Sequence, residues 1–145
     1  MGASKFLTKA QQRSIVAAIE EAERNTSGEI RVHIESLCAG DPMERAVCLF
    51  DQLKMYETAQ RNGVLIYVAY QAHKLAIVGD QGIHQVVPSN FWNAVKDQLL
   101  ADFAAGAFVE GLVAAIRQSG LQLKQYFPYQ SDDINEQSDE ISFGE

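Results

Sequence analysis

The sequence has few cysteines and no long apolar run, and each shortage excludes a class of protein. Only Cys38 and Cys48 are present among the 145 residues. Neither belongs to a CxxC motif or a Cys/His cluster, so we expect neither a disulfide framework nor a zinc site. No apolar run reaches the roughly 18 residues that span a bilayer, and no apolar signal sequence opens the chain. We therefore expect a cytoplasmic protein without a transmembrane segment.

Positive charge is also scarce, because 12 Lys and Arg residues face 19 Asp and Glu residues, for a net charge of −7. This balance argues against nucleic acid as a partner, since affinity for a phosphate backbone comes from clustered Lys and Arg. Residues 129–145 carry six of the acidic side chains and no basic one. We predict one folded, monomeric domain over residues 1–128, followed by a mobile and dispensable acidic tail over residues 129–145.

Helical and strand periodicities alternate clearly along residues 1–128. Thr8 and Gln11 form a capping box before the first apolar helical pattern. Asp41 and Pro42 are the N-cap and first residue of a second helix. For that helix we expect an apolar stripe formed by Met43, Val47, Phe50 and Leu53. We also expect Cys48 to be a small core residue on this face. Further helices are predicted over residues 89–105 and 108–126, and strands over residues 29–35, 64–70 and 74–78.

The lengths of the connections predict the sheet. A helix separates the first two strands, which favours a parallel pair with a right-handed crossover. Only residues 71–73 separate the second strand from the third, so these two strands form an antiparallel hairpin. The unbroken apolar run at residues 64–70 is typical of a central strand. The sequence therefore predicts an α/β fold with a small mixed sheet and helices on both of its faces.

The strand at residues 29–35 alternates strictly between apolar and polar side chains. Ile30, Val32 and Ile34 share one face. His33 and Glu35 share the other face, which we expect to be the wetter one. We interpret them as a hydrogen-bonded surface pair rather than a catalytic pair.

The predicted topology places acidic residues at one edge of the sheet. The first two strands begin at this edge, beside Glu29 and Asn62, and the third strand ends there at Asp80. Carboxylate and amide oxygens are ligands that Ca²⁺ and Mg²⁺ prefer. The sequence therefore predicts a divalent-cation site at this edge. In the alternative interpretation, both carboxylates cap turns and face water.

Four segments resemble the TPM domain family: TSGEIRV at residues 26–32, NGVLI at 62–66, GDQGI at 79–83, and Gly106 to Leu112 together with the preceding Phe103. The resemblance extends over residues 6–127. It implies a three-layer α/β/α sandwich and a divalent-metal site, commonly for calcium, in which Glu29 and Asp80 match motif positions and Asp102 is a further candidate. From the residues alone, Asp102 is most simply a solvated charge at a helix end.

Two functions remain open from the sequence. The first is a binding module that holds Ca²⁺ or Mg²⁺ and presents a surface to a protein partner. The alternative is a metal-dependent acid phosphatase of modest activity, an activity reported for plant members of the family. A phosphatase needs a nucleophile or an activated water, and cationic groups on the phosphoryl oxygens. The predicted edge offers only Arg31 or Arg61 and no poised Ser, Cys or His, which favours the binding module.

Overall fold

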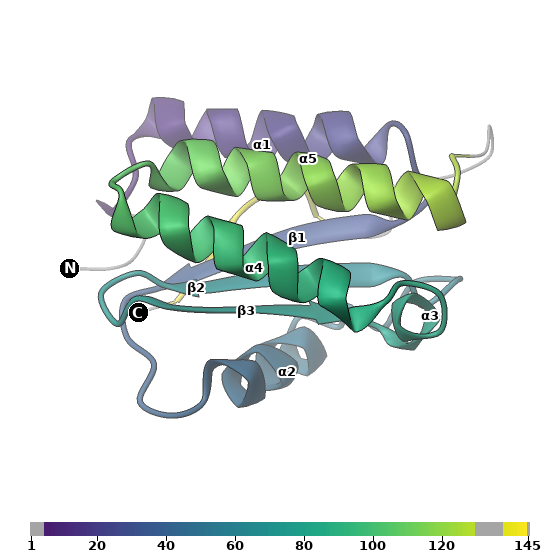
Figure 1. Cartoon of the computed structure of the whole chain (residues 1–145), viewed down its shortest axis with the longest axis horizontal. Coiled ribbons are helices and arrows are strands. Elements are labelled where there is room, and N and C mark those ends of the chain that lie inside the picture. The colour runs from purple at the N-terminus through teal and green to yellow at the C-terminus, as the bar shows by residue number, and fades with distance from the viewer. Residues whose placement is uncertain (1–4, 130–137, 145) are drawn as a thin grey trace.

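The computed structural model describes residues 5–129 and 138–144, in which each predicted helix and strand is present, together with a short helix and a short strand that were not predicted (Figure 1). The helices are α1 (Lys9–Glu23), α2 (Pro42–Gln52), α3 (Gln81–His84), α4 (Ser89–Ala104) and α5 (Phe108–Tyr126). The strands are β1 (Glu29–Glu35), β2 (Gly63–Ala69), β3 (Lys74–Gly79) and β4 (Ser142–Phe143). The predicted capping box at Thr8 and the Asp41 cap of α2 are both present.

The strands form one mixed sheet in the order β3-β2-β1-β4. Strand β1 runs parallel to β2, with Glu29 opposite Gly63, and β2 runs antiparallel to β3, with Val64 opposite Gly79. Helices α1, α4 and α5 cover one face of the sheet and α2 covers the other (Figure 1). The three-layer α/β/α sandwich, the parallel pair and the hairpin are thus confirmed.

Two apolar cores lie on the two faces of the sheet. Ile30, Val32 and Ile34 of β1 point into the larger core, under α1, α4 and α5. Leu65 and Tyr67 of β2 point into the smaller one, under α2. All seven residues of β2 are buried, because helices cover both faces of this strand. This explains why its sequence is an apolar run rather than an alternation.

The predicted apolar stripe of α2 is wrong in part. Met43 and Val47 are 43% and 53% exposed, and Cys48 is also exposed. The helix instead buries Ala46, Leu49 and Phe50 against β2 and β3. The small side chain of Ala46 lets the helix backbone lie close to the sheet, a preference that hydrophobicity alone does not reveal.

Strand β4 was not predicted, and it brings the end of the chain onto the sheet. Ser142 and Phe143 pair in parallel with His33 and Ile34, and the Gly144 N–H donates to the Ile34 carbonyl at 2.9 Å. The side chain of Phe143 packs against the larger core. This strand was not expected in the tail, because two residues are too few to show a periodicity, and the dispensability of the tail stays a prediction. Residues 130–137, on which the predicted mobility also rests, lie outside the described part of the chain.

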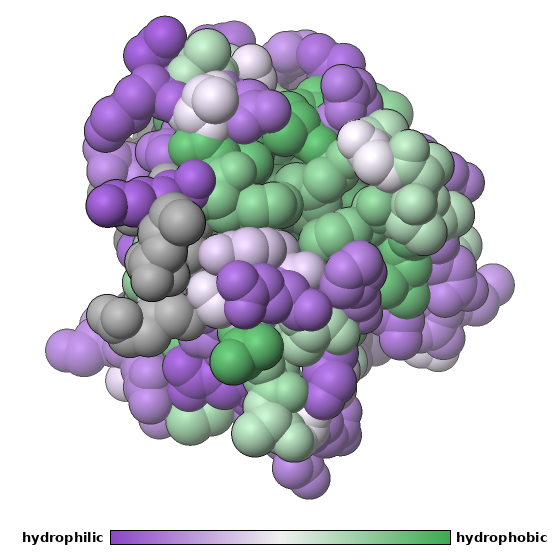
Figure 2. Space-filling model, turned by 90° about the vertical axis from the view of Figure 1, so that its left-hand side faces the viewer, coloured by the Kyte–Doolittle hydropathy of each residue, from purple (hydrophilic) through white to green (hydrophobic). Residues whose placement is uncertain are grey.

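Aromatic side chains gather at the end of the molecule that holds the β2–β3 turn and the α4–α5 connection. Phe6 stacks on Tyr70 with ring centroids 4.0 Å apart, and Phe103 contacts both Phe108 and His73. Figure 2 shows this end, where apolar surface reaches solvent between polar margins. These contacts tie the segment before α1 and the α4–α5 connection to the β2–β3 turn. Within the described residues, none of the helices combines the length and the apolar character needed to cross a membrane.

Candidate functional site

The edge where β1 and β2 begin and β3 ends brings Glu29, Asn62 and Asp80 together, and we call these residues with Gly63 the acidic rim. Glu29 lies opposite Gly63, and the Asp80 N–H donates to the Gly63 carbonyl at 2.9 Å. Glu29 and Asp80 therefore stand in one row across the sheet, on either side of Gly63. Two strand spacings place their α-carbons about 10 Å apart. The predicted meeting of these two residues at one edge is present.

Oxygen atoms other than carboxylates also lie at the acidic rim. A Cβ built on Gly63 would stand 3.0 Å from the Met55 carbonyl oxygen, so this oxygen lies close over Gly63, between the positions of Glu29 and Asp80 in the row. The Glu29 N–H donates to the Asn62 carbonyl at 3.3 Å. The side-chain oxygen of Asn62 is buried and has no hydrogen-bond partner within the described structure. An unpartnered buried oxygen is costly unless a donor or a cation satisfies it.

Asp80 has an ion-pair partner that the sequence analysis did not assign to it. The Arg61 guanidinium donates to both carboxylate oxygens of Asp80, at 2.7 and 2.9 Å. Asp80 also accepts the Gln81 N–H at 2.7 Å and so caps α3. The capping role left open by the sequence is therefore present for Asp80, although this residue is buried rather than facing water. The Arg61 side chain is 42% exposed, so it can move away from Asp80 into solvent.

Asp102 is not part of the acidic rim, which corrects its inclusion among the predicted metal ligands. It lies near the end of α4, where it accepts a hydrogen bond from Gln98 at 3.1 Å. Its neighbour Phe103 packs on His73 of the β2–β3 turn, at the opposite end of the sheet from Asp80. Among residues 5–129 and 138–144, no three His, Cys, Asp or Glu side chains are grouped so as to hold a metal ion. A cation at the acidic rim would therefore depend on two carboxylates and on carbonyl or amide oxygens.

A half-buried acid, Glu23, lies close enough to Glu29 to interact with its charge. The Glu23 carboxyl accepts the Ile30 N–H at 2.8 Å. This bond satisfies a backbone donor of β1 at a position that β4 does not pair. Burial, the side chain of Asp139 and the charge of Glu29 raise the pKa of Glu23 to about 10. Glu23 is therefore protonated at neutral pH and adds no negative charge there.

We expect Glu23→Gln to stabilise the fold at alkaline pH. Glu23 ionises near its usual pKa of 4.5 when unfolded but only near pH 10 when folded. Its contribution to stability is thus complete below pH 4.5 and is lost as the pH rises toward 10. Gln keeps the shape of the protonated acid without this loss. Urea unfolding at pH 8 should give a gain of about 1–3 kcal/mol, with almost none at pH 4.5.

Exposed Glu20 on the same helix provides the control, because Glu20→Gln changes a surface side chain and should alter stability by less than about 0.5 kcal/mol. If Glu23→Gln instead lowers stability at pH 8, Glu23 is ionised in the folded protein and the assignment of its proton is wrong.

A second polar group, here called the His33 cluster, lies at the other end of β1 and consists of His33, Glu35, Arg45, Tyr67 and Ser142. Glu35 accepts hydrogen bonds from His33 Nε2 at 3.0 Å, from Arg45 at 2.9 and 3.0 Å, and from the Tyr67 hydroxyl. His33 Nδ1 lies 2.9 Å from Ser142 Oγ. The predicted His33–Glu35 pair is confirmed, but its surface position is wrong, because the two residues are only 4% and 5% exposed.

Burial affects the two titrating members of the His33 cluster differently. Burial by itself would raise the pKa of Glu35, but the hydrogen bonds from Arg45, Tyr67 and His33 outweigh it and lower that pKa to about 2. Burial lowers the pKa of His33 below its usual value. At neutral pH the cluster therefore holds an ionised carboxylate and a neutral imidazole. The sequence showed two of its members at alternate positions of one strand, whereas the other three come from α2, β2 and β4.

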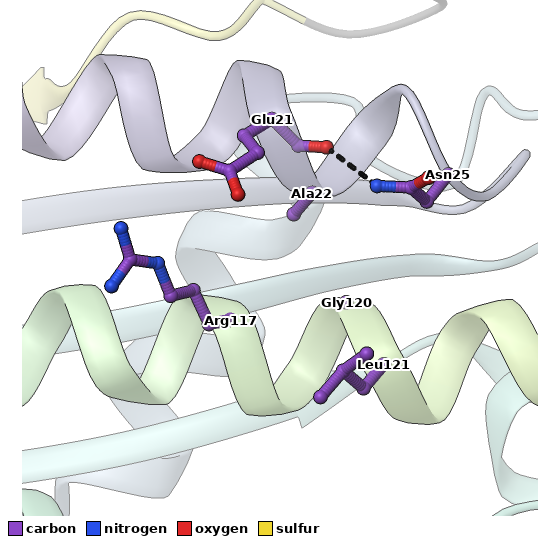
Figure 3. Close-up of a pocket in the computed structure, with 6 residues that line it drawn as sticks. All are labelled: Glu21, Ala22, Asn25, Arg117, Gly120 and Leu121. Atoms are coloured by element: carbon purple, nitrogen blue, oxygen red, sulfur yellow. Dashed lines mark hydrogen bonds between the residues drawn. The ribbon is translucent and has the colours of Figure 1, made fainter.

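A cavity of about 650 Å³ lies between α1 and residues 140–143, and two others lie near the remaining elements. One of about 600 Å³ borders the His33 cluster and is lined by Glu35, Leu37, Cys38, Ala39, Gly40, Asp41, Glu44 and Arg45. Another, of about 200 Å³, lies between α1 and α5 (Figure 3). Along this second groove, a Cβ on Gly120 would stand 2.7 Å from that of Ala22. The close approach of the two helices explains the glycine, and this groove holds no cluster of reactive groups.

Comparisons with known proteins agree with this architecture. The TPM domain family matches residues 3–121. The NMR structure of the BA42 protein from the psychrophilic bacterium Bizionia argentinensis is 45% identical, with a TM-score of 0.88 and 94% of each chain covered. A search of curated proteins finds no match.

Two more distant structures share the fold alone. The N-terminal domain of the cg2496 protein from Corynebacterium glutamicum is 13% identical, with a TM-score of 0.66, and covers 91% of this chain and 82% of its own. An N-terminal domain from P. gingivalis is 18% identical, with a TM-score of 0.64, and covers 86% of this chain and 82% of its own. The family match spans most of the chain and the BA42 structure covers nearly all of it, so the chain belongs to the TPM domain family.

Proposed function

We propose that this TPM domain is a binding module whose ligand is a divalent cation, Ca²⁺ or Mg²⁺, held at the acidic rim. The observation that carries the proposal is the row formed by Glu29, Gly63 and Asp80, with the Met55 carbonyl oxygen over its centre. Two carboxylates that flank a carbonyl oxygen offer a hard cation the ligands it prefers. The missing side chain of Gly63 lets the Met55 carbonyl oxygen come this close to the row.

Arg61 competes with the cation for Asp80. Its guanidinium already neutralises the Asp80 carboxylate, so a divalent cation binds there only if Arg61 moves into solvent. Such competition weakens affinity, and we expect binding in the millimolar range. Because Arg61 leaves Asp80 when the cation binds, the charge displayed at this edge changes with the cation. This change is the signal that a protein partner would recognise.

A calcium titration of the wild type, Asp80→Asn and Arg61→Gln tests the proposal. Calcium at ten times its dissociation constant should stabilise the wild type by about 1.4 kcal/mol. Asp80→Asn should lose this effect, because the variant removes a charged ligand. Arg61→Gln should bind calcium several-fold more tightly, because it removes the competitor. Melting temperature and calorimetry report both results, and exposed Asp97 on α4 provides an Asp→Asn control that should behave as the wild type.

Amide chemical shifts locate the cation independently. Calcium should move the resonances of Glu29, Gly63 and Asp80 more than those on the outer face of α1. The proposal fails if calcium moves only residues 138–144, or if Arg61→Gln leaves the affinity unchanged.

The phosphatase alternative receives less support from the geometry. A phosphatase needs cationic groups free to meet phosphoryl oxygens. At the acidic rim, Arg61 is engaged by both oxygens of Asp80. We therefore favour cation binding over phosphoryl transfer at this edge.

A further inference from the structure

We propose that Ser142 is an activated nucleophile for acyl transfer, with His33 as its general base and Glu35 as a positioning residue. Ser142 Oγ lies 2.9 Å from His33 Nδ1, and His33 Nε2 lies 3.0 Å from Glu35 Oε1. A hydroxyl, an imidazole and a carboxylate joined in this order recur as the catalytic groups of hydrolases with unrelated folds. The three residues lie at the far end of β1 from the acidic rim, so the proposal is independent of cation binding.

The hydrogen bonds of Glu35 define where the protons lie. Arg45 and the Tyr67 hydroxyl both donate to Glu35 and keep this carboxylate ionised. An ionised carboxylate only accepts hydrogen bonds, so His33 Nε2 must carry the ring proton. His33 Nδ1 is then left with its lone pair toward Ser142, and the hydroxyl donates to it. This is the protonation state in which the imidazole can take the serine proton.

The surroundings hold the imidazole in this orientation. The Tyr67 ring lies nearly parallel to that of His33, with centroids 6.0 Å apart. Gly144 packs directly against Glu35 and His33, since a Cβ there would stand 2.5 Å from Glu35 Oε1 and 3.0 Å from His33 Nε2. His33 and Glu35 are thereby shielded from water, whereas Ser142 keeps partial exposure. A rigid, shielded base beside a reachable hydroxyl is the arrangement that general-base catalysis requires.

The reaction balances without an external oxidant or cofactor. Ser142 Oγ attacks the carbonyl carbon of an ester and forms a C–O bond while its proton passes to His33 Nδ1. The bond to the leaving alcohol then breaks, and that proton moves from His33 to the departing oxygen. Water releases the acyl group from Ser142 by the same two proton transfers.

We assign one backbone N–H to the developing oxyanion from the alternation of the strand. Successive N–H groups of a strand point to opposite sides, and the Gly144 N–H points to β1. The Phe143 N–H therefore points to the open edge of the sheet, next to Ser142. A cavity of about 600 Å³ borders Glu35 and Arg45 of the same cluster, so we infer that an ester with a small acyl group can reach Ser142 from this side.

Acylation by 4-nitrophenyl acetate tests the proposal on the full chain. We expect one acetyl group per chain, located on Ser142 by peptide mass spectrometry. Ser142→Ala should abolish this adduct. Ser138→Ala should not, since that serine accepts the Glu140 N–H of the same segment and is not bonded to His33 in the described structure. His33→Gln and Glu35→Gln should slow acylation at least ten-fold.

The pH profile distinguishes activation by His33 from a merely structural bond. The groups that face His33 are Glu35 and Arg31 of β1, Tyr67 of β2 and Arg45 of α2, with Ser142 of β4. The acylation rate should be flat from pH 7 to 8 and fall ten-fold per unit of pH once His33 is protonated, below pH 6.5. This measurement uses the wild type, so it tests the role of His33 even if His33→Gln does not fold.

Three results would each overturn the proposal. The first is an adduct spread over lysines with no preference for Ser142. The second is a rate that keeps rising between pH 7 and 10. The third is a folded Glu35→Gln protein, with native circular dichroism, that reacts as fast as the wild type.

Discussion

Replacing Ile66 with Ala should lower the free energy of unfolding by about 2–5 kcal/mol, measured by urea denaturation. Ile66 is fully buried at the centre of β2, with Val32 of β1 opposite it on one side and Ile77 of β3 on the other. Removing three of its side-chain carbons loses the transfer free energy of those atoms and leaves a cavity. Helices cover both faces of this strand, so the surrounding residues can collapse into that cavity only in part.

Leu121→Ala supplies the control for this variant, because Leu121 is 70% exposed on α5. Its loss should change stability by less than about 0.5 kcal/mol. An Ile66→Ala cost below about 1 kcal/mol would show that β2 is peripheral, in conflict with the sheet order in Figure 1.

Glu35→Ala should cost a comparable amount, about 2–4 kcal/mol, because it leaves buried hydrogen-bond donors without their acceptor. The Tyr67 hydroxyl and His33 Nε2 would lose their acceptor in a buried site, and the Arg45 guanidinium would lose its counter-ion. Urea unfolding at pH 7 measures the loss. Glu44→Ala on the exposed side of α2 is the matched control and should cost less than about 1 kcal/mol.

The free energy of unfolding at acidic pH provides an independent test that Glu35 is ionised in the fold. The pKa of Glu35 is lowered in the fold, from its usual 4.5 to about 2. The stability that Glu35 contributes is therefore present above about pH 4.5 and lost as the pH falls toward 2. Wild-type unfolding should show this loss and Glu35→Ala should not. An equal acid sensitivity in both proteins would mean that Glu35 is not held ionised by its partners.

The helices and strands of the body were predicted because their signals are local. The strict alternation of residues 29–35 defines β1, and the turn residues at its ends limit it. The helix predicted over residues 108–126 coincides with α5. Short connections determined the parallel and antiparallel pairings, and these pairings in turn brought Glu29 and Asp80 to one edge. That much of the candidate site followed from chain order and strand direction alone.

The partners of those residues were decided by tertiary structure. Arg61 pairs with Asp80 across a turn, and no sequence pattern predicts the geometry of that turn. Asp102 lies at the opposite end of the sheet because α4 runs back along the sheet. The face that α2 turns toward the sheet depends on how closely Ala46 can approach β2. Side-chain volume decides this, and the spacing of hydrophobic residues does not.

The sequence by itself determined the α/β class, the order of the elements other than α3 and β4, the topology of the first three strands and the edge where the two carboxylates meet. These properties depend on periodicity, caps and connection lengths, which act over a few residues. Only the tertiary structure decided that His33 and Glu35 are buried and that Ser142 reaches them from the end of the chain. Burial of polar side chains is stable only when hydrogen-bond partners meet them. Those partners come from α2, β2 and β4, so no local pattern in β1 contains this information.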